Sequence, residues 1–144
     1  MPSTTLAEGT CISINVKGSS WEERYQDTLL SCRRALAQHL PISVVFQHEK
    51  DNLVDKNALS VCVNCPDLNL SSSIIGYVGK ENIQRVHSAL LSGVSNVILD
   101  RITSYFSPPP NSKRIWQAVI VVTKCGKWLP KDNNYVYNQT LHLG

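Results

Sequence analysis

Residues 49–61 concentrate carboxylate and amide side chains in a chain of 144 residues of which only 17% are charged. The segment reads EKDNLVDKNALSV, with three carboxylates and two asparagines directly before an apolar run. Asp and Asn side chains can bond to nearby backbone and reverse the chain, so the segment predicts a tight turn between two strands. The same carboxylates could instead form the rim of a binding site.

A lysine at a helix start is the second candidate group. Lys80 opens a segment with helical periodicity, so its ammonium group and the first free backbone amides of the helix could hold the same anion.

Aromatic and basic residues come together in SYFSPPPNSKR, where Tyr105 and Phe106 precede a loop that carries Lys113 and Arg114. Aromatic rings that stack on bases, beside cations that neutralise phosphates, are typical of sites for single-stranded nucleic acid. From the residue types alone, the simpler interpretation is structural. The net charge is only +3, so the rings would close the core and the cations would form a solvated rim.

Other chemistries have weaker support. Cys62 and Cys65 have the C-x-x-C spacing of zinc ligands, but no second pair follows. His87 and Cys125 are possible further ligands, but they do not form a pair. A Cys62 in strand register would instead be a small buried hydrophobe. No nucleophile signature, zinc-protease motif or phosphate-binding glycine loop occurs. We therefore expect neither an enzyme nor a cofactor.

Length and composition predict one domain with a real core, since 42% of the residues are apolar. The first residues, MPSTTLAEGT, do not resemble a secretory signal, and the apolar runs are too short to span a bilayer. An odd number of cysteines suits free thiols in a reducing compartment. We expect an intracellular protein that does not contact a membrane.

The most secure predicted element is a helix that begins near residue 21. Its apolar side chains recur at three- and four-residue steps: Trp21, Tyr25, Leu29, Cys32, Leu36 and Leu40. Ser20 and Glu23 fit a capping box, and Pro41 is expected to end the helix.

The remaining segments predict strands and one shorter helix. The strands are expected at 9–16, 42–48, 57–63, 74–79, 95–106 and 114–124, and the helix at 80–91 with Gly93 as its C-cap. Residues 64–73 read as a polar connection, and Gly76 as a bulge or a close backbone approach.

The fold class that follows is α+β and mainly β. We expect a small, partly open antiparallel β-barrel of the OB or SH3 kind with two flanking helices. Residues 1–8 would be a flexible terminus, 9–124 the domain, and 125–144 a C-terminal extension.

The order of these segments resembles the HIRAN domain. That family shows a segment E-x-DN-x-x-D-x-NA-h-x-V, where h is apolar, followed by h-GYh-x-x-E and a helix. The first pattern is matched here by Glu49, Asp51, Asn52, Asp55, Asn57, Ala58 and Val61, and the second by Ile75, Gly76, Tyr77, Val78 and Glu81. The resemblance covers about residues 9–124.

The resemblance implies a non-catalytic β-barrel module that binds single-stranded DNA or DNA 3′ ends in nuclear DNA repair. By position, Asp55 matches an acidic residue that contacts the terminal hydroxyl, and Lys80 matches a lysine that contacts phosphate. Tyr105 or Phe106 lies where an aromatic ring stacks on a base.

Two positions depart from the DNA-end binders of that family. Val54 replaces an aromatic residue, and Asn15 with Lys17 lies where a basic–aromatic pair is found. Each missing stacking platform could forfeit ~1–3 kcal/mol of binding. The alternative is therefore a protein-interaction module on the same barrel. The candidate nucleic-acid-binding residues are Asn15, Lys17, Val54, Asp55, Lys80, Tyr105 and Phe106.

Overall fold

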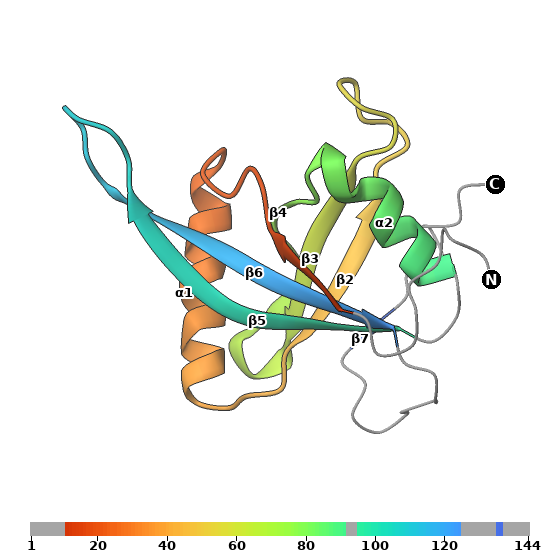
Figure 1. The fold of residues 1–144 in the computed structure, drawn as a ribbon. Coiled ribbons are helices and arrows are strands. Elements are labelled where there is room, and N and C mark those ends of the chain that lie inside the picture. Colours follow the sequence, from red (N-terminus) through yellow and green to blue (C-terminus); the bar gives the residue numbers. More distant parts are fainter. Residues whose placement is uncertain (1–10, 92–94, 125–134, 137–144) are drawn as a thin grey trace.

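The computed structural model describes residues 11–91, 95–124 and 135–136 (Figure 1). The strands are β1 (Cys11–Asn15), β2 (Ser43–His48), β3 (Leu59–Cys65), β4 (Leu70–Tyr77), β5 (Ser95–Phe106), β6 (Arg114–Lys124) and β7 (Tyr135–Val136). The helices are α1 (Glu23–Ala37), α2 (Lys80–Leu91) and the short 3₁₀ turn η1 (Pro66–Leu68). The predicted cap at Gly93 and the terminus 1–8 lie outside the described residues.

The strands form two sheets, with the orders β1-β6-β5 and β4-β3-β2-β7. Neighbouring strands are antiparallel except β2 and β7, which are parallel. The sheets meet where Lys17 and Tyr77 exchange two backbone hydrogen bonds of 2.8 Å. The mainly β class with two helices is confirmed. The barrel is correct only in part, because this bridge is the one backbone junction of the two sheets among the described residues.

One core lies between the sheets and is covered by both helices. Ile12 and Ile14 of β1 point inward while their neighbours are exposed, as their alternation predicts. Phe46 of β2 is fully buried, Leu29 comes from α1, and Val86 comes from α2. No helix in the described part of the chain is long and apolar enough to cross a membrane.

The start of α1 differs from the prediction. The helix begins at Glu23, and Glu22 caps it without a side-chain hydrogen bond, so the capping box of Ser20 and Glu23 is wrong. Gly18 has φ +75°, and its carbonyl accepts the N–H of Trp21 at 3.0 Å. This turn keeps Trp21 out of the helix, and its side chain is 70% exposed instead of buried.

The polar connection expected over 64–73 is also wrong. β3 extends to Cys65, and β4 begins at Leu70 after η1. Asn69 adopts a left-handed conformation with φ 57°, which reverses the chain, and the Asn64 side chain accepts the N–H of Ser72 at 2.7 Å. Polar side chains here support a hairpin and not a loop, since Asn tolerates left-handed backbone.

Gly76 was expected at a bulge or at a close backbone approach, and the structure shows both features. The pairing of β3 and β4 shifts register at this residue, and φ is +150°. A β-carbon on Gly76 would lie 2.5 Å from the Lys17 carbonyl oxygen and 2.5 Å from Val16 Cγ1. The missing side chain allows the two sheets to approach at the Lys17–Tyr77 bridge.

We expect Gly76→Ala to lower the free energy of unfolding by more than ~1 kcal/mol. Backbone strain alone costs ~1–3 kcal/mol, and the steric clash adds to it. Urea denaturation measures the change. Gly79→Ala is the matched control, because the atoms nearest to a β-carbon there belong to the end of the Glu81 side chain and not to backbone. Equal losses in the two variants would contradict this account of Gly76.

Candidate nucleic-acid interface

A cavity of about 520 Å³ opens where the two sheets meet. Four segments line it: the turn before α1, the first turn of α1, the loop between β2 and β3, and the entrance of α2. The lining residues are Lys17, Trp21, Glu22, Tyr25, Asn52, Val54, Asp55, Ala58, Tyr77, Val78, Gly79, Lys80, Glu81 and Ile83. The structure therefore brings together four of the predicted site residues, Lys17, Val54, Asp55 and Lys80.

The loop between β2 and β3 is held by side-chain hydrogen bonds to its own backbone. Asn52 Oδ1 accepts the N–H groups of Val54 and Asp55, both at 2.9 Å. Asp55 Oδ1 in turn accepts the N–H of Asn57 at 2.9 Å. The predicted turn chemistry is thus present, and Asp55 takes part in it with one carboxylate oxygen. The second oxygen has no hydrogen-bond partner among the residues described, and Asp55 lines the cavity.

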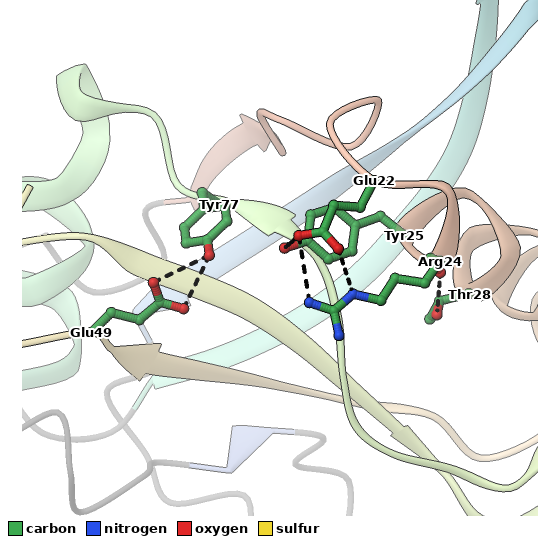
Figure 2. A network of polar contacts seen from close by, with 6 residues as sticks. All are labelled: Glu22, Arg24, Tyr25, Thr28, Glu49 and Tyr77. Carbon is green, nitrogen blue, oxygen red and sulfur yellow. Dashed lines mark hydrogen bonds and ion pairs between the residues drawn. The ribbon is translucent and has the colours of Figure 1, made fainter. Parts of the chain in front are cut away.

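Glu49 ties this loop to β4. The Tyr77 hydroxyl donates one bifurcated hydrogen bond to the two Glu49 carboxylate oxygens, at 3.2 and 3.1 Å (Figure 2). Asn52 Nδ2 donates to the same carboxylate at 3.0 Å. Burial and the Glu49 charge raise the pKa of Tyr77, so the phenol stays protonated and remains a donor. The loop is therefore fixed against the sheet by a charge-assisted bond.

The opposite wall is aromatic. The Trp21 ring lies 5.8 Å from the Tyr77 ring. The Tyr25 hydroxyl donates to Glu22 at 3.3 Å, as Figure 2 shows. Glu22 also pairs with Arg24 at 2.8 Å, and this hydrogen bond raises the pKa of Arg24. The sequence interpretation missed this wall, because it placed Trp21 on the buried helix face, where Tyr25 does lie buried as predicted. The glycine–serine turn before Trp21 was the available signal.

The entrance of α2 is electrically mixed. Lys80 is exposed. The Glu81 side chain folds back over Gly79, and its carboxylate lies 2.6 Å from the position that a β-carbon on this glycine would take. Within the described ranges, no ion pair joins Lys80 or Lys17 to a carboxylate. The cavity thus holds two unpaired cations beside three carboxylates, those of Glu22, Asp55 and Glu81.

Three predicted residues do not line the cavity. Asn15 is exposed on β1 and pairs with Val119. Tyr105 and Phe106 lie at the far end of β5, where Phe106 contacts Arg114. Their expected role in closing the core is also wrong, since both rings are exposed.

The C-x-x-C cysteines do not share a site. Cys62 Sγ lies 3.9 Å from the Gln47 amide oxygen, while Cys65 lies close enough to Cys32 to affect its ionisation. Burial raises the pKa of Cys32 to about 12, and it also raises that of Cys62, so these thiols stay protonated. No cluster of three or more potential metal ligands occurs within the described residues.

A histidine pair joins the loop side of the cavity to α2. His48 Nε2–H donates to the Lys56 carbonyl at 2.7 Å, so its Nδ1 carries no proton in the neutral ring. The His87 ring lies edge-on to it at 5.9 Å. His48 Nδ1 and His87 Nε2 are buried, and neither atom has a hydrogen-bond partner in the described structure. Burial lowers the pKa of His87, and the neighbouring His48 lowers it further.

Comparison with protein-family models, with curated proteins and with solved structures returned no match.

We expect Tyr77→Phe to lower the free energy of unfolding by about 1–2 kcal/mol, because Glu49 loses a donor to a charged group. The amide protons of Val54 and Asp55 should also exchange faster, which hydrogen-exchange NMR measures. Tyr105→Phe removes an exposed hydroxyl near the end of β5, away from the loop, so loop exchange should stay unchanged there. Unchanged loop exchange in Tyr77→Phe would contradict the proposed tie.

We also expect stability to fall as the pH drops from about 6.5, the pKa of an unperturbed histidine. The unfolded chain then binds a proton that the buried His87 does not, which favours unfolding. His87→Leu should flatten the free energy of unfolding between about pH 6.5 and pH 5. His39→Asn, at an exposed left-handed position, should leave the slope unchanged. An unaltered slope in His87→Leu would show that another group causes the acid loss.

Proposed function

We propose that this protein is a HIRAN-like, non-catalytic module that binds the 3′ end of single-stranded DNA in the cavity between the sheets. The observation that carries the proposal is that Asp55 and Lys80 line one cavity, and that no ion pair joins them within the described structure. A carboxylate can accept a hydrogen bond from a hydroxyl, and an ammonium can pair with a phosphate. A strand end presents both groups close together.

The charge balance of the cavity favours an end over the middle of a strand. A groove that only follows phosphates is usually positive throughout, because binding is driven by counterion release. Here three carboxylates, one of them paired with Arg24, lie beside two lysines: Glu22, Asp55 and Glu81 beside Lys17 and Lys80. A neutral hydroxyl near Asp55 is compatible with this mixture, whereas a terminal phosphate in the same position would be repelled.

In this proposal the aromatic contact comes from residues other than those at the stacking positions of the HIRAN family. Val54 and Asn15 lack rings, but Trp21 is 70% exposed and stands at the cavity beside Tyr77. Base–aromatic stacking contributes ~1–3 kcal/mol per base and tolerates any sequence. Trp21 therefore serves as the stacking platform in this proposal. We also propose that this two-sheet fold is related to the OB or SH3 barrels.

A protein partner is the second candidate. Leu53 and Val54 are apolar and fully or almost fully exposed at the loop tip, with Val54 at 90%. Exposed large apolar side chains that cluster at a rim are typical of protein-interaction sites. Such a partner would bind through the loop tip without a steep dependence on salt.

We expect single-stranded DNA with a free 3′ hydroxyl to bind, and affinity to fall as salt rises. Lys80→Ala should weaken binding to all sequences and reduce the salt slope by about 0.7, the value of one phosphate contact on a single strand. Asp55→Asn should selectively reduce the preference for a 3′ hydroxyl over a 3′ phosphate. Fluorescence anisotropy with end-labelled oligonucleotides measures both effects.

Lys56→Ala is the matched control, because Lys56 is an exposed lysine of the same loop that does not line the cavity. Absence of detectable single-strand binding at about 50 mM salt would refute the proposal. Binding that Leu53→Ser abolishes and salt does not alter, with a protein ligand, would favour the second candidate.

A further inference from the structure

Two arginines and two aromatic rings form a continuous stack outside the cavity. The Arg33 guanidinium lies 5.0 Å from the centre of the Trp116 ring, and the Arg114 guanidinium lies 5.6 Å from the same ring. Arg114 also lies 4.8 Å from the centre of the Phe106 ring. We call these four residues the arginine–aromatic ladder. It joins α1 to the end of the β5–β6 hairpin, which projects beyond α1 (Figure 1).

The ladder is held in place by Gln26 of α1. The Gln26 side chain donates to the Trp116 carbonyl at 2.9 Å and accepts the Trp116 N–H at 2.8 Å. The Gln26 amide thus satisfies both backbone polar groups of Trp116, a residue of β6 that does not pair with β1. Because Gln26 follows Tyr25, the first turn of α1 fixes both the cavity wall and the ladder.

Stacking leaves the edges of both guanidinium groups available. An arginine that lies over a ring uses its face, and its N–H groups remain free to donate. Arg114 gives one N–H to Ser104 Oγ at 2.8 Å. In the described part of the chain, the ion pairs are Arg24 with Glu22 and Arg101 with Asp100, so neither ladder arginine is paired with a carboxylate.

The ladder also exposes a ring that makes no contribution to the core. Phe106 is 62% exposed, and it lies at the open end of the stack. Lys113 and Arg34 add two exposed cations close in sequence to the ladder. An exposed ring next to unpaired, pre-oriented guanidinium groups matches a ligand with alternating anionic and flat apolar groups.

We infer that the ladder is a second contact for a single nucleic-acid strand, with phosphates on Arg33 and Arg114 and a base on Phe106. This inference builds on the proposed binding of a strand end in the cavity, but it concerns a different surface. An acidic peptide would satisfy the arginines but would leave Phe106 without a stacking partner. The ladder therefore favours a nucleic acid.

The experiment compares two double variants that remove the same charge. Arg33→Gln with Arg114→Gln removes the ladder cations, and Arg85→Gln with Arg101→Gln removes two exposed arginines that belong to neither the ladder nor the cavity lining. Anisotropy titrations use a strand of about 16 nucleotides and a tetranucleotide, the two ends of the usual site size. The salt dependence is measured for each strand.

The ladder variant should bind the long strand roughly tenfold more weakly at low salt. Its salt slope should fall by about 1.4, which is 0.7 for each of two lost phosphate contacts. Its affinity for the tetranucleotide, which occupies the cavity, should be unchanged. The control variant should lose less than half as much on the long strand.

Equal losses in the two double variants would overturn the inference, as would a lower melting temperature with unchanged affinity, which indicates a purely structural ladder. Displacement of the long strand by polyglutamate as readily as by polythymidylate would also overturn it. If the ladder double variant does not fold, Arg33→Gln alone provides the test, since Arg33 is exposed on α1. Loss of tetranucleotide binding in Lys80→Ala, with the ladder effect intact, separates the two proposals.

Discussion

Tyr77 is the residue on which this architecture depends. Its backbone exchanges two hydrogen bonds with Lys17 and so joins the sheets, while its hydroxyl donates to Glu49 and fixes the loop between β2 and β3. Its ring also lies against Trp21. Gly76, directly before it, permits the close approach of the backbones that this bridge needs. The cavity exists because these constraints act at one position, with a sheet junction, a polar loop and an aromatic turn around it.

The same constraints explain why the site is pre-formed. The Asn52 side chain holds the amides of Val54 and Asp55, and Glu49 holds Asn52, so the loop needs no ligand to take its shape. A site that is already ordered avoids part of the entropy cost of binding. The unpaired charges of Asp55 and Lys80 can remain apart because each side chain belongs to a different rigid element.

Sequence patterns predicted most elements of the fold and part of the site. Alternation identified β1, and the turn chemistry around Asn52 was visible in its residue types. Trp21 was misassigned, because the helical spacing of apolar residues continues back through the turn that Gly18 and the two following serines form. The ladder could not be predicted, since Trp116 and Arg33 are far apart in sequence and meet only through tertiary packing. Barrel closure likewise depends on where two sheets meet, which local patterns do not encode.

The central claim is that a strand end occupies the cavity between Asp55 and Lys80. Amide chemical-shift mapping of the labelled protein with a tetranucleotide that carries a free 3′ hydroxyl tests it most directly. The account predicts that the largest changes fall on the amides of Asp55, Tyr77 and Lys80. Changes confined to surfaces away from these residues, with the cavity amides unmoved at saturation, would contradict it.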